Sequence, residues 1–239
     1  MPAPLTVAVV QPAAAEAARP DTVAVNAERH AAAVREAGTR LVVFPELSLT
    51  GYDLAAPAVG PDDARLAPLV AACAGTGATA LVGAPVADAD GREYIGTLAV
   101  TGAGAAVVYR KMYLHGSEAD RFSCGGKPVV LELDGWRLGL AICADAAEPP
   151  HAERTAALGI DAYVASTLYG DAPEAVARRE SQLRDRAAAH GVWGVLATTA
   201  GASGTYPRTS GGSGVWAPGG ALVVQAGAEP GEIVRTGLR

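Results

Sequence analysis

Short apolar runs alternate along this chain with segments in which apolar residues recur every three to four positions. Short runs bounded by Gly, Pro or Asp predict β-strands, whereas the longer periodic segments predict helices. We therefore expect strands over the following ranges: Leu5–Val10, Leu41–Phe44, Thr79–Gly83, Tyr94–Thr101, Ala105–Arg110, Val129–Leu133, Trp136–Ile142, Ala162–Ala165, Val192–Thr198, Gly214–Trp216, Ala221–Gln225 and Ile233–Gly237.

Four segments carry the features of helices. Asp21 is placed to cap a helix that ends at Gly38, and Asp62–Gly75 and Pro150–Leu158 are also helical in pattern. Asp171 followed by Glu174 predicts a capping box for a long helix that ends at His190. About a dozen strands with helices between them favour an α/β layered domain. No linker, repeat or charge run divides the chain, so we expect a single domain over residues 1–239.

The bulk composition excludes several classes of protein. A net charge of -6 and a pI near 5.2 disfavour nucleic acid as a partner, because phosphate binding needs clustered Lys and Arg. No apolar stretch reaches the roughly 18 residues that span a bilayer, and the first residues lack a basic leader. Three cysteines, an odd number, suit free thiols in the cytoplasm. Dispersed histidines and the lack of a Cys-x-x-Cys pair disfavour a metal hydrolase.

Three residues, each at the end of an apolar run or just past it, are candidates for catalysis. The chain has only 2 lysines against 17 arginines, and one of them, Lys111, ends an apolar run. Glu46 and Cys143 also lie just past apolar runs. If the three runs are neighbouring strands, a carboxylate, an ammonium and a thiol would form a catalytic set.

The chemistry of such a set is specific, although each residue alone has a plainer interpretation. A thiol with a pKa near 8.5 needs a base to become a nucleophile, and a partly buried Glu is a suitable base. An ammonium and the backbone N–H groups of a sharp turn stabilise an oxyanion. Alternatively, Cys143 is a buried structural cysteine, Glu46 faces water and Lys111 reaches solvent from a strand end. Cys73 and Cys124 are interpreted as structural or loop thiols.

Read together, these segments resemble the nitrilase superfamily of carbon–nitrogen hydrolases. Val42–Leu47 with Thr50–Tyr52 is similar to its glutamate motif, and Arg110–Gly125 to its lysine motif. Gly139–Asp145 is similar to its nucleophile motif, and Gly212–Gly220 to its C-terminal Gly-Ser and Pro-x-Gly pattern. The resemblance runs nearly from end to end.

The resemblance implies a four-layer α-β-β-α sandwich of two mixed sheets and a Glu46–Lys111–Cys143 triad. Glu46 would act as general base, while Lys111 and the N–H of Ala144 would hold the oxyanion. Glu118 matches a second glutamate of many members, which positions substrate or assists proton transfer. The resemblance also implies a homodimer without a cofactor. Our candidates for the pocket wall are Tyr52, His115, Glu118, Ser166, Thr167, Leu168 and Tyr169.

Departures from the family pattern bear on the substrate. Members that recognise a substrate carboxylate often carry Arg after the nucleophile motif, where this chain has Ala146 and Ala147. We therefore expect an amidase that acts on a small, uncharged, linear amide through a thioester. Nitrile hydrolysis, N-carbamoyl hydrolysis, acyl transfer and a catalytically silent binding homologue stay open, because the motifs do not separate them. The Gly- and Ser-rich stretch Gly201–Gly212 is expected to be a loop.

Overall fold

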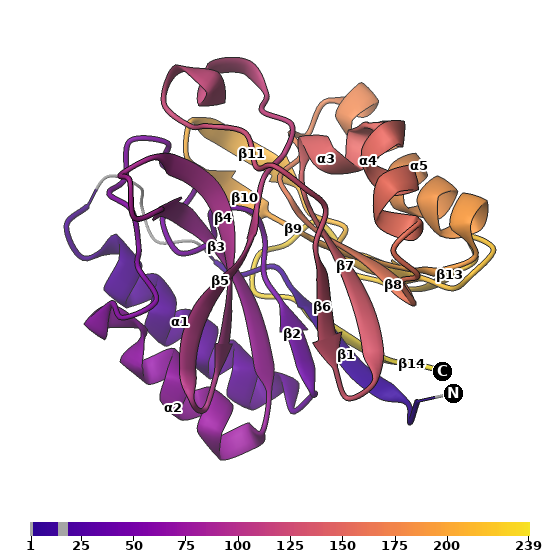
Figure 1. Ribbon diagram of the computed structural model, residues 1–239, viewed down its shortest axis with the longest axis horizontal. Coiled ribbons are helices and arrows are strands. Elements are labelled where there is room, and N and C mark those ends of the chain that lie inside the picture. The colour runs from indigo at the N-terminus through magenta and orange to yellow at the C-terminus, as the bar shows by residue number, and fades with distance from the viewer. Residues whose placement is uncertain (1, 14–18) are drawn as a thin grey trace.

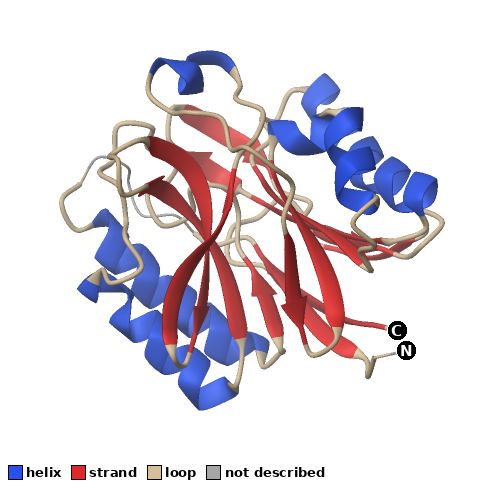
Figure 2. Ribbon diagram, in the orientation of Figure 1, coloured by secondary structure: helices blue, strands red, loops and turns tan. Residues whose placement is uncertain are grey.

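The computed structural model describes residues 2–13 and 19–239, in which two six-stranded sheets pack face to face. Helices cover the outer face of each sheet, so the layers follow the order helix, sheet, sheet, helix (Figure 1, Figure 2). The predicted four-layer α-β-β-α sandwich is therefore confirmed. Among the described residues, no helix is both long enough and apolar enough to cross a membrane.

The first sheet joins the N-terminal half of the chain to its C-terminal strand. Its order is β14 (Ile233–Leu238), β1 (Leu5–Val10), β2 (Leu41–Val43), β3 (Thr79–Ala87), β4 (Glu93–Thr101) and β5 (Gly104–Arg110). Strands β1, β2 and β3 are parallel, and β14, β4 and β5 each pair antiparallel with their neighbours. Its outer face is covered by α1 (Thr22–Ala37) and α2 (Ala67–Thr76), the second preceded by the 3₁₀ turn η1 (Ala64–Leu66).

The second sheet has the same plan. Its order is β13 (Leu222–Gln225), β12 (Gly214–Trp216), β9 (Trp193–Thr198), β8 (Ala162–Thr167), β7 (Trp136–Ile142) and β6 (Val130–Leu133). The three central strands β7, β8 and β9 are parallel. The helices α3 (Ala144–Ala147), α4 (Pro149–Ala156) and α5 (Pro173–His190) lie on its outer face. A second 3₁₀ turn, η2 (Gly116–Asp120), follows β5.

Alternation along the strands decides which layer each side chain enters. In β1, Leu5, Val7 and Val9 face the second sheet and join the core between the sheets. Ala8 and Val10 point the opposite way and pack against the helices of the first sheet. This alternation follows from the two-residue period of a strand. Because both faces of β1 are covered, its sequence is apolar throughout most of its length.

Two predicted helix starts differ from the structure in their capping. Asp21 occupies the N-cap position of α1, but its side chain makes no capping hydrogen bond. The capping box predicted at Asp171 and Glu174 is wrong, because Pro173 takes the first helical position and makes Ala172 the N-cap. Asp171 lies one residue too early and pairs with Arg208 instead, at 2.8 Å.

The stretch predicted as a Gly- and Ser-rich loop is a β-hairpin. Strands β10 (Ala200–Ser203) and β11 (Tyr206–Ser210) pair antiparallel as a small third sheet. The hairpin tip is tied to the N-terminal half of the chain, because the N–H of Gly204 donates to the carbonyl oxygen of Gly51 at 2.8 Å. A side chain at Gly204, where φ is +55°, would collide with the backbone of Tyr52. Glycine therefore permits this close approach.

Candidate active site

Strand direction brings Glu46 and Lys111 to the same edge of the first sheet. Strand β4 runs antiparallel to both β3 and β5, so β5 runs in the same direction as β2 and β3. The residues that follow β2 and β5 consequently leave the sheet at the same end. Glu46 lies three residues beyond β2, and Lys111 directly follows β5.

The three candidate runs are not neighbouring strands, which corrects the condition we placed on them. Strands β3 and β4 separate β2 from β5, and β7, which precedes Cys143, belongs to the other sheet. Packing of the two sheets brings the ends of these strands together, with β5 in contact with β7. The convergence is thus a product of layer packing and not of strand pairing.

Lys111 is completely buried and lies between two carboxylates. Its Nζ donates to Oε1 of Glu46 at 2.7 Å and to Oε1 and Oε2 of Glu118 at 2.7 and 2.8 Å. Burial acts to lower the pKa of Lys111, but the negative charges of the Glu46 and Glu118 carboxylates outweigh it and raise the net pKa. Lys111 is therefore a permanent buried cation. Its compact ammonium group offers three hydrogen-bond donors.

Glu46 combines burial with an incomplete set of partners. Its side chain is fully buried, and Oε2 has no hydrogen-bond partner among the described residues. Burial raises the pKa of Glu46, the ammonium of Lys111 lowers it, and the carboxylate of Glu118 raises it further, with a net rise. The Cys143 thiol lowers the pKa of Glu46 as a weak donor. A carboxyl group of raised pKa can accept a proton from such a thiol.

The backbone around Glu46 depends on a glycine of the adjacent strand. The residues 45–47 lie directly across Gly83 of β3, where any Cβ would collide with the backbone of Pro45 and Leu47. Leu47 itself has φ of +49°, in the left-handed region. The N–H of Leu49 then donates to the carbonyl oxygen of Gly83 at 3.0 Å. Gly83 therefore fixes how closely the glutamate loop approaches the sheet.

Glu118 is held in place by three different elements. Besides Lys111, it accepts the N–H of His115 at 2.8 Å and a long contact from the hydroxyl of Tyr52 at 3.5 Å. Its side chain is 4% exposed. The sequence motif did place Glu118 near Lys111, but the structure adds that Glu118 is a direct partner of the ammonium. Glu118 and Glu46 together give the cluster one more negative charge than positive.

Cys143 lies at a sharp turn between β7 and α3. Its φ is +45°, a conformation that is strained for a residue other than glycine and that is often kept at functional sites. The N–H of Cys143 donates to the carbonyl oxygen of Ser166 at 3.0 Å, and Sγ contacts the carbonyl oxygen of Leu168 at 3.6 Å. Ala144 follows as the first residue of α3, where backbone N–H groups have no partner within the helix.

The resting sulfur is a thiol and not a thiolate. Burial raises the pKa of Cys143, the charge of Glu46 raises it further and Lys111 opposes them, and the result is about 12. A thiol of this pKa is almost entirely protonated near pH 7. The same contributions show that Glu46 and Lys111 lie within electrostatic reach of the sulfur. A nucleophile at Cys143 therefore needs a base at the moment of attack.

Asp145 links the turn at Cys143 to the turn at Lys111. One carboxylate oxygen accepts the N–H groups of Met112 and Tyr113 at 3.0 and 2.8 Å. The other accepts the N–H of Ile142 at 2.9 Å and the hydroxyl of Tyr109 at 2.7 Å. Asp145 is completely buried, so these four donors compensate its desolvation. Asp145 thereby links the end of β5 in the first sheet to the end of β7 in the second.

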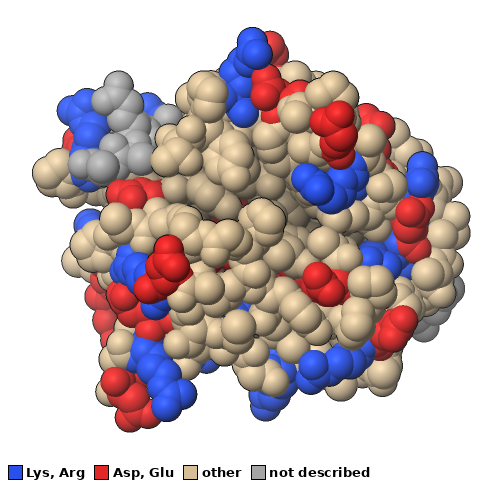
Figure 3. Space-filling view, turned by 90° about the horizontal axis from the view of Figure 1, so that it is seen from above, with Lys and Arg blue, Asp and Glu red and all other residues tan. Residues whose placement is uncertain are grey.

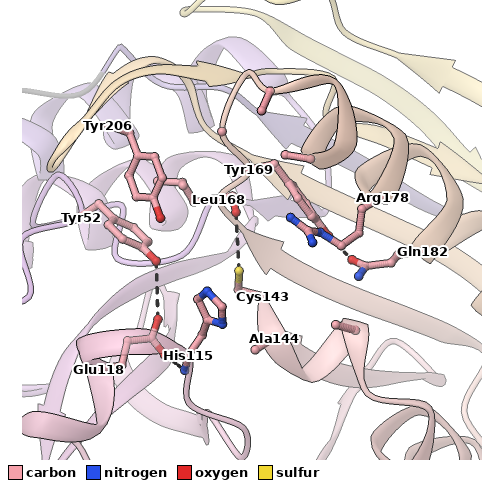
Figure 4. A pocket seen from close by; sticks show the side chains of 14 residues that line it. Tyr52, His115, Glu118, Cys143, Ala144, Leu168, Tyr169, Arg178, Gln182 and Tyr206 are labelled. Carbon is pink, nitrogen blue, oxygen red and sulfur yellow. Dashed lines mark hydrogen bonds between the residues drawn. The ribbon is translucent and has the colours of Figure 1, made fainter.

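A pocket of about 350 Å³ opens above Cys143. Its wall includes Tyr52, His115, Glu118, Ala144, Leu168 and Tyr169 from the predicted set (Figure 4). Ser166 and Thr167 are not in this wall, because both are still within β8. There the carbonyl oxygen of Ser166 accepts the N–H of Cys143, and the Thr167 hydroxyl donates to Ala197. Viewed from above, uncharged side chains make up most of the middle of this face, with a few acidic and basic side chains among them (Figure 3).

Sequence reasoning missed the wall contributed by α5 and by the β10–β11 hairpin. The missed polar residues are Arg178, Gln182 and Tyr206. Tyr206 makes an edge contact with Tyr52, with ring centroids 5.9 Å apart. Ala175, Arg178 and Gln182 follow a spacing of three and four residues, so they share one face of α5. That spacing is visible in the sequence, but nothing in it indicates which face meets the pocket.

Comparison with known proteins identifies the family. The chain matches the sequence profile described as carbon-nitrogen hydrolase over residues 6–237. The chain belongs to the carbon–nitrogen hydrolase family, the nitrilase superfamily, as its three motifs predicted.

Several relatives carry hydrolase or amidase descriptions. "Hydrolase in pqqF 5'region" of Pseudomonas protegens is 35% identical over 158 residues, which are 62% of this chain and 55%, little over half, of that protein. Hydrolase MT0498 of Mycobacterium tuberculosis is 30% identical over 84% of this chain and 79% of its own length. An (R)-stereoselective amidase of a Pseudomonas species is 30% identical over 79% of this chain and 69% of its own.

Solved structures support the same fold. Saccharomyces cerevisiae Nit3, a nitrilase superfamily member, superposes with a TM-score of 0.86 at 22% identity, over 98% of this chain and 90% of Nit3. The NitN amidase of Nesterenkonia sp. AN1 superposes with a TM-score of 0.81 at 26% identity, over 98% of this chain and 93% of that amidase.

Proposed function

We propose that this protein hydrolyses the C–N bond of small linear amides through a thioester on Cys143. The observation that carries the proposal is the buried cluster of Glu46, Lys111 and Glu118 next to a protonated thiol at a pocket floor. Paired carboxylates and a buried ammonium are costly to bury, and such perturbed groups gather at functional sites. The cluster supplies the base and the cation that the thiol lacks.

The first half of the reaction forms the thioester. Sγ of Cys143 attacks the amide carbon, and the thiol proton passes to Oε2 of Glu46, the oxygen that has no hydrogen-bond partner among the residues described. The carbonyl oxygen becomes an oxyanion, which the Nζ of Lys111 and the N–H of Ala144 stabilise. Two of the three Nζ contacts go to a single carboxylate, so one N–H can turn to the oxyanion. The intermediate then collapses, and Glu46 returns the proton to the departing nitrogen.

The second half of the reaction releases the acid. Water attacks the thioester carbon while Glu46 takes one of its protons, and the thiolate leaves. The proton then returns from Glu46 to the sulfur, and the carboxylic acid departs. Throughout this cycle Glu118 holds the Lys111 ammonium in place beside Glu46, because it binds the same ammonium and itself accepts the N–H of His115.

The relatives support this chemistry without deciding the substrate of this chain. A mutant of the Nesterenkonia amidase carries the acetamide moiety of fluoroacetamide on its active-site cysteine, and another structure contains acrylamide. Nitrile and N-carbamoyl hydrolysis use the same groups and stay as alternatives, as does a catalytically silent homologue. We also propose a cytoplasmic homodimer, on the family resemblance and on the three free thiols.

An amide panel with a matched cysteine control tests the proposal. The wild type should release ammonia from simple aliphatic amides, and Cys143→Ala should lose about 10⁴-fold or more of that rate. Cys124→Ala, which removes the exposed thiol, should leave the rate unchanged. Intact-mass analysis of a rapidly quenched reaction should show the acyl group on Cys143. A wild type that hydrolyses no amide, nitrile or ureido compound, or that matches Cys143→Ala, would refute the proposal.

A further inference from the structure

The outer wall of the pocket carries an arginine that has no counter-ion in the part of the chain that the structure describes. Arg178 lies on α5, is exposed to solvent, and forms no ion pair with any carboxylate of residues 2–13 and 19–239. Its neighbour Arg179 is different, because its side chain is nearly buried and its Nη1 donates to the carbonyl oxygens of Ser210 and Gly211. Arg179 therefore holds the hairpin in place, whereas Arg178 is available to a ligand.

Gln182, one turn further along α5, adds to the donors at this wall. Its Oε1 accepts the hydroxyl of Tyr169, which orients the amide, and its two N–H groups have no hydrogen-bond partner among residues 2–13 and 19–239 (Figure 4). A guanidinium has five N–H donors and no acceptor. The wall formed by Arg178 and Gln182 thus offers several N–H donors from one face of α5. Its complement is a group with several acceptor oxygens, and the planar fork of Arg matches a carboxylate.

Charge divides the pocket into two ends. At the inner end the wall includes Glu118, which belongs with Glu46 to the buried cluster around the single cation Lys111, so an anionic group of a substrate would be repelled there. The outer end is lined by the cation of Arg178, which pairs with no carboxylate among the described residues. Tyr169 also lines the pocket, and its hydroxyl donates to Oε1 of Gln182. Burial raises the pKa of this hydroxyl, and the positive charge of Arg178 lowers it.

We propose that Arg178, assisted by Gln182, binds a carboxylate on the substrate at the end remote from the scissile bond. The preferred substrates would then be amides with an anionic tail, and not the uncharged amides that Ala146 and Ala147 led us to expect. The cation comes from α5 instead of the turn after Cys143. A pocket of about 350 Å³ lies near the small end of ligand sites, which suits a short chain between the two groups. This inference rests on the proposed amidase function.

Matched amides and a matched arginine test the assignment. Glutaramate and pentanamide have acyl chains of equal length and differ by the terminal carboxylate. The kcat/KM ratio of glutaramate to pentanamide should fall about 10- to 100-fold in Arg178→Gln, the range for hydrogen bonds to a charged group. Arg178→Lys should retain part of the preference. Arg184→Gln removes a charge from the same helix outside the pocket, and should leave the ratio unchanged.

Ionic strength and the position of the carboxylate refine this test. Since Arg178 is exposed, the preference for glutaramate should weaken as salt increases. A preference for N-butanoylglycine over N-ethylbutanamide that also depends on Arg178 would assign the carboxylate to the leaving amine instead of the acyl chain. A wild type that favours the neutral member of both pairs would overturn the proposal. An equal loss for charged and neutral substrates in Arg178→Gln would do the same.

Binding without turnover separates this inference from the proposed function. Calorimetry on Cys143→Ala should show tighter binding of glutarate than of pentanoate, and the difference should vanish when Arg178→Gln is added. If the wild type hydrolyses no amide and this difference persists, the amidase function fails and the carboxylate site stands. If amides are hydrolysed and the two ligands bind Cys143→Ala equally, the carboxylate site fails alone.

Discussion

Replacing Glu46 by Gln should make the Cys143 thiol more acidic while it abolishes hydrolysis. Gln keeps the size of the side chain and one of its two acceptor oxygens, but it removes the negative charge and cannot act as a base. The carboxylate of Glu46 is, after burial, the largest contribution that raises the pKa of Cys143. The ammonium of Lys111 acts in the opposite direction and stays in place in the variant.

The size of the shift follows from the positions of these charges. The pKa of Cys143 is about 12, against about 8.5 for an ordinary thiol. An adjacent carboxylate typically changes a pKa by about 1–3 units, and burial, which Glu46→Gln leaves unchanged, is the larger cause here. We therefore expect the thiol pKa to fall by about one to two units. Each unit corresponds to about 1.4 kcal/mol of relative stabilisation of the thiolate.

Thiolate absorbance during a pH titration measures this shift. Cys124→Ser removes the exposed thiol, and Cys73 is buried with a pKa raised to about 11 by its burial. The difference between titrations with and without Cys143→Ser isolates the reactive sulfur. Glu132→Gln is the control, because Glu132 is exposed and pairs with Arg137 far from the pocket. Amide hydrolysis is measured on the same preparations.

Two results would contradict this reasoning. A thiol pKa that stays the same or rises in Glu46→Gln would mean that Glu46 carries no charge in the resting protein. Retained hydrolysis in the same variant would mean that another group accepts the thiol proton. A variant with a more acidic thiol and no turnover would separate the two roles of Glu46, since thiolate formation alone would then be insufficient for catalysis.

Two further predictions concern stability. Burial lowers the pKa of His30 to about 3 and of His151 to about 4, so the unfolded chain binds protons below about pH 6.5 that the folded protein does not. The two histidines should therefore not weaken the fold above that pH, and the free energy of unfolding, measured with urea, should fall by about 4 kcal/mol between pH 7 and 5. An equal free energy of unfolding at the two pH values would contradict this. Asp145→Asn replaces an acceptor of four donors by an amide with one oxygen. Asp145→Asn should lower the free energy of unfolding by about 3–5 kcal/mol. Asp171→Asn, at the surface, should lower it by less than about 0.5 kcal/mol.

Most of the regular elements could be predicted from the hydrophobic pattern. Strand β1 matches its predicted bounds, and the four predicted helices correspond to α1, α2, α4 and α5. A single residue was enough to predict the end of a helix at Gly191, whose left-handed conformation ends α5. Local signals were insufficient where two of them competed. At the start of α5 the proline decided the first helical residue, and the acidic pair that suggested a capping box had no effect.

Local signals also failed at the ends of strands, where the pocket lies. Strand β8 continues two residues beyond its predicted end, so Ser166 and Thr167 are strand residues and not wall residues. The stretch 201–212 has a loop-like composition, yet it pairs as β10 and β11 because its tip docks on Gly51 and its base on Arg179. These outcomes depend on partners distant in the sequence, which no local window contains.

The sequence alone determined the chemical groups and the strand ends that carry them. A glutamate, a lysine and a cysteine each follow an apolar run, and this position along the chain is the same however the strands pack. Only the tertiary structure decided their distances and ionisation. Glu46 and Lys111 meet because β5 runs in the direction of β2, and Cys143 approaches them from the opposite sheet. Burial and charge then act across these contacts, so a fixed ammonium, an unusually basic carboxylate and a protonated thiol arise only when the two sheets pack.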